Sequence, residues 1–368
     1  MTMLEEFYEL VTTDSASGDE RLIADKLKEK LAAIGCEVFE DPREAERVGG
    51  NTGNVYAVLE GEGEGSILFC SHMDRVANGR GIRPVERDGR LFAQGTILAA
   101  DDIAGVCAIL DGLRRLKASA RPHPRIEVLF TVFEEDGMRG SKAADLSRIR
   151  SRIGYVFDSG GRIGRIINEA TSKLDVSIRA AGKAAHAGNA PEKGASALYA
   201  AALLLSRLPH GRIDAISTAN FSNFAASGPN NVVSDAAELS GEMRSLDFAR
   251  CERWLDTLRD TAADVTRETG VSFDVRAETE FRHFRVPPES RTVRIAEAAF
   301  SALGIPTVIE SVGGGMDANI LAEAGIECIG LATGYFDNHT PRESLVIDDF
   351  LRTGELAAAI AYAAADVR

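Results

Sequence analysis

The chain has 368 residues and a formal net charge of −14. That length exceeds what one hydrophobic core usually organises, so we expect two domains, one of which can be inserted in the other. The acidic balance argues against a nucleic-acid or anionic-membrane partner, because both interactions need basic surface.

Cysteine usage and hydropathy bear on the compartment. The sequence MTMLEEFYELV has no basic stretch before an apolar run, which argues against a signal peptide. No segment approaches the roughly 18 uninterrupted apolar residues of a membrane span. The five cysteines form no CxxC pair, and apolar neighbours of Cys70, Cys107 and Cys328 favour buried free thiols. We therefore expect a soluble, cytoplasmic protein.

Strand and helix patterns alternate along the first 170 residues. Short apolar runs predict strands over residues 54–59, 66–70, 128–133 and 155–157. Apolar residues at helical spacing predict helices over 22–34 and 103–116. The sequence Ser17-Gly-Asp-Glu20 has the pattern of a capping box before the first helix, and Gly35 ends that helix.

The pattern changes near Thr171. From there the order of elements is roughly βαββαβ, the split arrangement of a small ferredoxin-like α+β sandwich. These elements are predicted over residues 173–180, 195–208, 220–225, 237–244, 250–268 and 271–278. We therefore expect an inserted domain over 172–283 and a discontinuous domain over 1–171 and 284–368.

Helix and strand patterns resume after Pro287-Pro288 and continue the first domain. They cover residues 293–303, 308–310, 319–324 and 328–332, and an alanine-rich helix follows. Such alternation predicts an α/β fold with a mostly parallel central sheet and helices on both faces. Ligands of such sheets bind outside the carboxyl ends of the strands, so we expect the functional site there.

Residue types that bind metal ions follow these strands or begin the long helix. They are His72, Asp74, Asp101, Glu134, Glu135, Asp158 and His339. If the strands share one sheet, two imidazoles and several carboxylates converge at one edge. That is the composition of a two-metal hydrolytic site.

Taken alone, each of these residues has an ordinary structural explanation. A His-x-Asp pair such as His72 and Asp74 often forms only a structural hydrogen bond. Asp101 can be a helix N-cap, and Asp158 before two glycines is a turn signal. An acidic pair after a strand can be a solvated loop. Their joint occurrence is what favours a metal site.

Within a metal site the same residues have distinct chemistry. Asp74 can hold the second ring nitrogen of a metal-bound His72 and so fix its tautomer. Asp101 can be shared between two cations about 3.5–4 Å apart. Neighbouring side chains at a strand end diverge, so one of Glu134 and Glu135 can bind metal while the other faces the attacking water.

Nine ordered strings carry a resemblance to a known family. They are SHMDRV, LAADDIAG, FTVFEEDGMRGS, FDSGG, GKAAHAG, NVVSD, GEMRSLD, GGGMDANI and NHTPRE. The chain resembles the peptidase T-like branch of the co-catalytic zinc exopeptidases, the family of acetylornithine deacetylase, succinyl-diaminopimelate desuccinylase and carboxypeptidase G. The resemblance covers nearly the whole chain. It implies a phosphorylase/hydrolase-like catalytic domain and an inserted domain that acts as a lid and a dimerisation surface.

The resemblance also implies which residues bind metal. One ion would be bound by His72, Asp101 and Asp158, and the other by Asp101, Glu135 and His339. Two zinc ions per subunit are expected, with cobalt or manganese as possible substitutes, because carboxylate-rich sites discriminate weakly among these metals.

Three further features follow from the resemblance. Glu134 matches the general base, and Asp74 matches the residue behind the first histidine. The peptide bond after the bridging Asp101 is commonly cis in this family. Ala99 replaces the glycine of the commoner Gly-Ala-Asp-Asp form, a small departure that leaves the carboxylates unchanged.

The remaining matches concern the substrate. His186 matches the histidine that polarises the scissile carbonyl, from the same chain or from a partner subunit; without the resemblance it is equally an ordinary surface histidine. Arg244 matches an arginine that engages the substrate carboxylate, where bidentate geometry favours arginine over lysine. Asn231 matches a substrate-side amide. Asp317 and Asn319 would line the pocket near the substrate.

The expected activity is metal-assisted hydrolysis of short peptides, with release of the N-terminal residue of a tripeptide as the first choice. Glu134 would take the proton of the attacking water, and His186 would stabilise the oxyanion. A deacylase or carboxypeptidase acting on N-acyl amino acids or dipeptides is the alternative within the class. A catalytically silent metal-binding scaffold is the alternative outside it. The expected partners are the peptide and a second copy bound through the lid.

Overall fold

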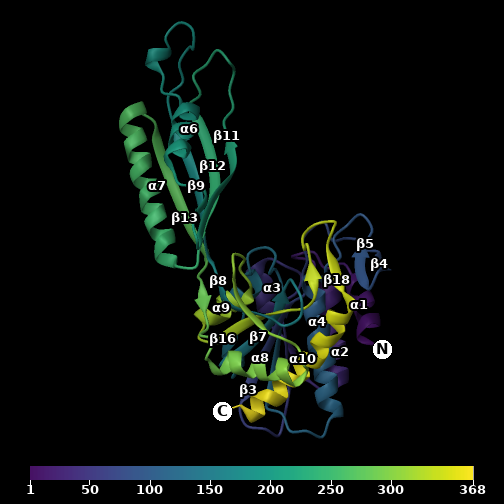
Figure 1. Ribbon diagram of the computed structural model, residues 1–368. Coiled ribbons are helices and arrows are strands. Elements are labelled where there is room, and N and C mark those ends of the chain that lie inside the picture. Colours follow the sequence, from purple (N-terminus) through teal and green to yellow (C-terminus); the bar gives the residue numbers. More distant parts are fainter. Residues whose placement is uncertain (368) are drawn as a thin grey trace. The chain divides into compact units, whose positions relative to one another are not determined.

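The structure, a computed structural model, describes residues 1–367 and forms two compact units (Figure 1). The large unit comprises Met1–Glu169, Phe284–Val312 and the chain from Met316 onward. The small unit comprises Ala170–His283 together with Gly313–Gly315. The insertion expected over 172–283 does not include these glycines. The carbonyl oxygen of Gly313 accepts a 3.1 Å hydrogen bond from Arg244 of the small unit.

A sheet that has nine strands within residues 1–367 forms the centre of the large unit. Its order is β1 (Glu37–Glu40), β2 (Val55–Leu59), β6 (Arg125–Thr131), β3 (Ser66–His72), β7 (Ile153–Ser159), β16 (Glu327–Ala332), β8 (Arg165–Ala170) and β14 (Phe284–Arg285), with β15 (Val308–Val312) beside β8. The central strands β6, β3, β7 and β16 run parallel to one another. β2 and β8 flank them with antiparallel pairing. The predicted parallel sheet is therefore confirmed for the centre.

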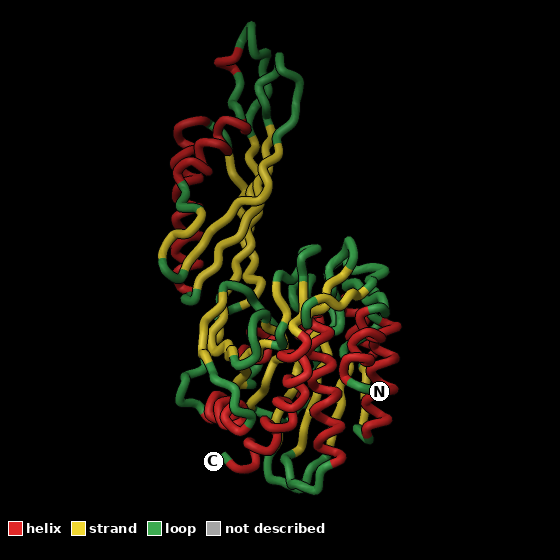
Figure 2. The backbone as a smooth tube through the Cα atoms, turned by 45° about the vertical axis from the view of Figure 1, so that its right-hand side comes forward, coloured by secondary structure: helices red, strands yellow, loops and turns green. Residues whose placement is uncertain are grey.

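Two groups of helices cover this sheet (Figures 1 and 2). The helices of the first group pack with one another. They are α1 (Met3–Val11), α2 (Arg21–Ile34), α4 (Ala100–Ala118), α8 (Arg291–Ala302) and α10 (Ile347–Asp366). The second group contains α3 (Pro42–Val48), α5 (Arg139–Ala143) and α9 (Asp317–Glu323), and the 3-10 helix η1 (Leu146–Arg148) precedes β7. Every residue of β3 and β7 after the first is buried, as expected for strands covered on both faces.

The start of α4 departs from regular helix geometry. Asp101 and Asp102 have non-helical backbone angles, so the regular helix begins at Ile103, as the apolar spacing predicts. The Asp101–Asp102 peptide bond is cis, as the resemblance implies. The two aspartates therefore belong to the loop that leads into the helix.

The large unit has a second, smaller sheet, in which the strands lie in the order β17, β18, β5 and β4. The bounds are β4 (Pro84–Arg87), β5 (Arg90–Ala93), β17 (Tyr335–Phe336) and β18 (Ser344–Val346). The segment between β17 and β18 carries His339. The sequence did not predict the β4–β5 hairpin, because its strands have only four residues each and three of these eight residues are charged.

The small unit is an antiparallel sheet with two long helices. The sheet order is β10 (Gly211–Asp214), β11 (Ser217–Ala225), β12 (Ala236–Ser245), β9 (Ser172–Ala181) and β13 (Ser272–Phe281). The helices α6 (Ala197–Arg207) and α7 (Phe248–Thr269) supply apolar side chains to its core, and η2 (Pro191–Lys193) lies in a loop. The predicted βαββαβ order lacked only β10, a four-residue edge strand. Among residues 1–367, no helix has the length and apolar character needed to cross a bilayer.

Candidate metal centre

The carboxyl ends of the central strands bring the predicted metal-binding residues together. β3 ends at His72, Glu134 follows β6, and Asp158 is the penultimate residue of β7. Asp101 comes from the start of α4, and His339 comes from the loop between β17 and β18. Because β6, β3 and β7 are parallel neighbours, their carboxyl ends share one edge of the sheet.

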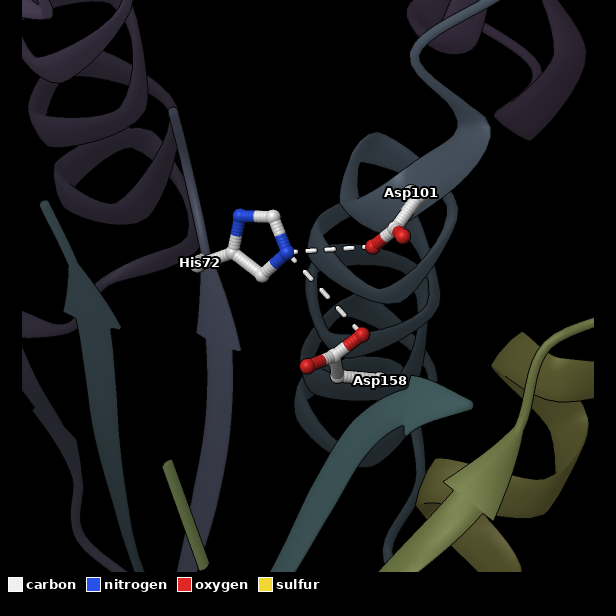
Figure 3. Close-up of side chains that lie close together, drawn as sticks. All are labelled: His72, Asp101 and Asp158. Atoms are coloured by element: carbon white, nitrogen blue, oxygen red, sulfur yellow. Dashed lines mark hydrogen bonds and ion pairs between the residues drawn. The ribbon is translucent and has the colours of Figure 1, made fainter. Parts of the chain in front are cut away.

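One group of possible ligands consists of His72, Asp101 and Asp158 (Figure 3). The Nε2 atom of His72 lies 3.1 Å from Oδ1 of Asp101 and 3.9 Å from Oδ1 of Asp158. Figure 3 shows both carboxylates facing the same ring nitrogen. The three residues are at most 9% exposed, so this group is largely shielded from bulk water.

The other group consists of Asp101, Glu135 and His339. The Nε2 atom of His339 lies 3.2 Å from Oδ2 of Asp101 and 2.9 Å from Oε1 of Glu135. Asp101 therefore turns one carboxylate oxygen toward each of the two histidines. The imidazole of His339 is 47% exposed, so the second group is accessible from solvent.

The chemistry of these donors fits two divalent cations. Buried carboxylates in close contact are costly unless a positive charge compensates them. The Oε1 atom of Glu135 is buried and lacks a hydrogen-bond partner among the described residues, although the contact with His339 is short. A cation between these two side chains would satisfy both. Imidazole and carboxylate together are ligand types that zinc and similar metals accept.

The same crowding changes the protonation of the ligands. Burial, and after it the charge of Asp101, raises the pKa of Asp158 to about 8. Burial opposes ionisation of Asp101, but hydrogen bonds from His339 and His72 outweigh it and hold the pKa of Asp101 below its usual range. Close contacts with the carboxylates of Asp101 and Glu135 raise the pKa of His339 to about 10. Protons and metal cations therefore compete for these side chains.

Asp74 connects the first histidine to the glutamate pair. Its Oδ1 atom lies 3.4 Å from Nδ1 of His72, and its main-chain oxygen lies 3.1 Å from the same nitrogen. Its carboxylate accepts hydrogen bonds from the backbone N–H of Glu134 at 2.9 Å and of Glu135 at 3.2 Å. Asp74 therefore orients the imidazole and also holds the main chain that carries both glutamates.

Glu134 is the acid–base candidate within this environment. Burial raises the pKa of its carboxyl group, the charge of His72 lowers it, and the charge of Asp158 raises it further. The net effect places the pKa well above its ordinary value. A carboxyl group with a raised pKa can both accept and return a proton near neutral pH.

Two supporting residues, Ser17 and Glu20, were misread as a helix cap. α2 begins at Arg21, and Glu20 makes no side-chain cap bond, so the predicted capping box is wrong. The Ser17 hydroxyl instead donates a 2.6 Å hydrogen bond to Asp74. The Glu20 carboxylate accepts a 3.1 Å hydrogen bond from the N–H of Phe133. These contacts hold the N-terminal segment against Asp74 and against Phe133, the residue directly before the glutamate pair.

Two more neighbours of the ligands escaped the sequence reasoning. The Tyr335 hydroxyl donates a 3.0 Å hydrogen bond to Asp158. The Asn338 amide donates a 2.5 Å hydrogen bond to Asp101. Asn338 stands in the string NHTPRE and could have been singled out there, whereas nothing local marks Tyr335.

The structure places His186 and Asn231 side by side in the small unit. The N–H of Ala187 donates a 2.9 Å hydrogen bond to the carbonyl oxygen of Asn231. The Nδ1 atom of His186 accepts hydrogen bonds from the N–H groups of Gly188 at 3.2 Å and Asn189 at 3.1 Å. The ring is therefore held by its own loop, and His186 is exposed.

Arg244 lies in a different part of the small unit. It is the penultimate residue of β12, whereas Asn231 precedes that strand. Its guanidinium donates two hydrogen bonds to Glu242, at 2.7 and 3.1 Å. The structure therefore does not bring Arg244 together with His186.

Asp317 and Asn319 are buried at the start of α9, at 1% and 0% exposed, so their expected position beside the substrate stays a prediction. The side-chain oxygen of Asn319 accepts a 3.1 Å hydrogen bond from the N–H of Met316. The Asp317 carboxylate accepts a 2.5 Å hydrogen bond from the Thr131 hydroxyl. Asn319 therefore closes the N-terminus of α9, and Asp317 ties the start of that helix to the end of β6.

In this α/β fold, two groups of metal-binding side chains share the carboxylate of Asp101. This arrangement is typical of hydrolases with two adjacent cation sites. The family is established by comparison with known proteins. The chain belongs to peptidase family M20/M25/M40, whose family model matches residues 68–363. The resemblance inferred from the nine strings is thereby confirmed. Ser17 and Glu20 lie outside the matched region.

Full-length relatives agree with this assignment. The crystal structure of aminopeptidase PepT from Bacillus cereus has a TM-score of 0.93 and 37% identity, covering 99% of this chain and 98% of that one. A tripeptidase from Staphylococcus aureus has a TM-score of 0.95 and 31% identity, with coverage of 99% and 98%. The uncharacterized protein YqjE of Bacillus subtilis is 37% identical over 365 residues, 99% of this chain and 98% of that protein.

Proposed function

We propose that the protein is a metallo-exopeptidase that releases the N-terminal residue of short peptides, with tripeptides as the preferred class. The observation that carries the proposal is the pair of donor groups that share Asp101. The full-length similarity to an aminopeptidase and to a tripeptidase supports the substrate class.

Two zinc ions per chain are the proposed cofactors. His72, Asp101 and Asp158 would hold one ion, and Asp101, Glu135 and His339 would hold the other. Cobalt or manganese can substitute in such a ligand set. When bound, the two ions supply Lewis acidity that activates water and polarises the scissile carbonyl.

Glu134 is the proposed general base. It takes a proton from the attacking water and returns it to the leaving amine, a role supported by its raised pKa. Asp74 holds the N–H of Glu134 at 2.9 Å and so limits the movement of this carboxylate. The main chain of Glu134 is therefore held in place before the substrate binds.

His186 is the proposed oxyanion donor. Its Nδ1 atom accepts two backbone N–H groups, so the neutral ring carries its proton on Nε2. Within residues 1–367 that proton has no hydrogen-bond acceptor, so it can be donated to the developing oxyanion. The loop geometry thus selects the tautomer that the reaction needs.

The small unit also supports a homodimer that completes the site. His186 follows the end of β9 that pairs with Ala236, and Arg244 lies eight residues further along β12, or roughly 27 Å at the usual rise of a strand. An extended tripeptide spans only about 10 Å. One peptide therefore cannot touch both residues of one chain, and we propose that the partner's lid supplies one of them. A substrate carboxylate at Arg244 would compete with Glu242.

Exposed apolar side chains of the small unit are the proposed dimer contacts. They are Leu198 (47% exposed), Tyr199 (64%), Phe224 (40%) and Val232 (37%). Covering such side chains with a second copy is favourable because it removes apolar surface from water. The five cysteines are free and buried, which suits a reducing compartment, so we place the protein in the cytoplasm.

A substrate panel tests this function against the alternative. Tripeptides, dipeptides and tetrapeptides are compared with N-acetyl and N-succinyl amino acids, using zinc-loaded and chelated protein. Chelator-sensitive release of the N-terminal residue from tripeptides is the expected result. Cleavage of the acyl amino acids alone would make the protein a deacylase with the same site, and silence on every substrate would support a non-catalytic scaffold.

A further inference from the structure

We infer that Glu343 is a positioning residue that ties the loop of Asp101 to the loop of His339 and so sets the affinity of both cation sites. This inference rests on the proposed metal centre. Glu343 makes no contact with the substrate in the proposed mechanism. Its effect passes through the backbone of Asp101, which belongs to both donor groups.

The carboxylate of Glu343 accepts hydrogen bonds from three backbone N–H groups of one short segment. Its Oε2 atom accepts hydrogen bonds from Leu98 at 2.9 Å and from Ala99 at 3.0 Å. Its Oε1 atom accepts a 3.1 Å hydrogen bond from Asp101 itself. Glu343 is 1% exposed, so these bonds form away from competing water.

This segment needs an external support because of its backbone conformation. Ala99 has φ 56° and ψ 34°, a left-handed conformation that residues with a Cβ atom rarely adopt. Ala99 and Leu98 precede the regular helix, so the N–H groups held by Glu343 have no partner within it. The carboxylate thus supplies the hydrogen bonds that this irregular stretch requires.

The position of Glu343 couples the two halves of the site. It lies four residues after His339, directly before β18, and His339 also has a left-handed backbone with φ 61°. The hydrogen bonds to Leu98, Ala99 and Asp101 span 242–245 residues of sequence. Movement of either loop therefore strains the same contacts, so the separation of Asp101 and His339 depends on them.

A carboxylate is required for this contact. Glutamine has one oxygen in place of two, and its NH₂ group would face an N–H donor, so E343Q loses at least one of the three bonds. Aspartate keeps both oxygens but is one methylene shorter, so E343D retains only part of the contact. Substitutions of residues that orient metal ligands typically weaken metal binding about 10–100-fold.

Glu127 provides a matched control within the same unit. It is 2% exposed and accepts 2.9 Å hydrogen bonds from the backbone N–H groups of Arg150 and Ser151. It lies near the beginning of β6, whereas the metal centre lies beyond the end of that strand. E127Q therefore weakens the same kind of contact, a buried carboxylate that accepts backbone N–H groups, at a place away from the metal ligands.

The test is a cobalt titration of metal-free protein followed by visible absorption, with thermal unfolding of the same samples. We expect the wild-type protein to bind two cobalt ions and E343Q to bind both about 10–100-fold more weakly. The affinities of E343D should lie between those of the wild type and E343Q. E127Q should lower Tm without changing either affinity. If E343Q does not fold, E343D carries the comparison. Unchanged cobalt affinities in the Glu343 variants would overturn the role of Glu343 but leave the metal centre intact. An equal loss of cobalt affinity in E127Q would do the same. Absence of cobalt binding in the wild type would overturn the metal centre as well.

Discussion

The backbone N–H of Glu134 donates a 2.9 Å hydrogen bond to the carboxylate of Asp74. The same carboxylate lies 3.4 Å from the imidazole of His72. The buried side chain of Asp74 therefore orients the imidazole of His72, a candidate metal ligand. It also holds the main chain of Glu134, the proposed base. Catalysis should be sensitive to this carboxylate although it is not expected to touch the substrate.

Asp74→Asn tests this link. Asparagine leaves one acceptor for two N–H groups, so we expect kcat/KM to fall about 10–100-fold with zinc in excess. Ser17→Ala is the milder control, because it removes only the 2.6 Å hydrogen bond to Asp74 and keeps the carboxylate. A wild-type rate in the asparagine variant would show that the glutamate loop is held by other contacts.

Glu134→Gln tests the base. The amide cannot accept the proton of water, so turnover should fall about 10²–10⁴-fold or more. The ligand groups contain Glu135 and not Glu134, so bound metal measured by elemental analysis should equal that of the wild type. Near-normal turnover would remove Glu134 from the mechanism, and loss of metal would make it a ligand.

Mixing two inactive variants tests whether a partner completes the site. If the histidine acts across a dimer, His186→Ala and Glu134→Gln proteins should regain activity after subunit exchange, since each hybrid contains one intact site. Random exchange of equal amounts predicts about a quarter of the wild-type activity. Hybrids with no activity above the two parents would place His186 in the site of its own chain.

The pH dependence of stability tests a carboxylate away from the site. Burial favours the neutral form of Glu40, but hydrogen bonds from Arg21, Lys28 and Thr52 outweigh it and lower the pKa from 4.5 to about 2. The ionised form therefore stabilises the fold above the unfolded pKa, and this contribution is lost as the pH falls from about 4.5 toward 2.

Glu40→Gln should remove that contribution, at most about 3 kcal/mol in the free energy of unfolding near neutral pH. The difference from the wild type should shrink below pH 4.5 and vanish near pH 2, as followed by urea unfolding. Glu268→Gln is the control, since its ion pair with Arg207 is exposed and should contribute little. A difference that is constant with pH would contradict the assignment.

Local sequence patterns predicted the elements that bury apolar side chains continuously. The run at 66–70 became β3, and the regular part of α4 begins at the predicted Ile103. Because parallel strands end at one edge, the ligand candidates could be expected to meet there before any coordinates were known.

Contacts between distant segments were beyond such patterns. Ser17 and Glu20 have the spacing of a capping box, yet their side chains bind Asp74 and Phe133. A polar side chain looks the same in sequence whether its partner is three residues away or more than fifty.

The measurement that tests the central claim most directly is a zinc titration of metal-free protein with tripeptide hydrolysis followed in the same samples. The account predicts two bound ions per chain, full activity only when both are present, and loss of both ions in Asp101→Asn, because Asp101 belongs to both donor groups. A single bound ion, or loss of only one ion in that variant, would contradict the shared-carboxylate centre. Two bound ions without tripeptide hydrolysis would contradict the proposed activity.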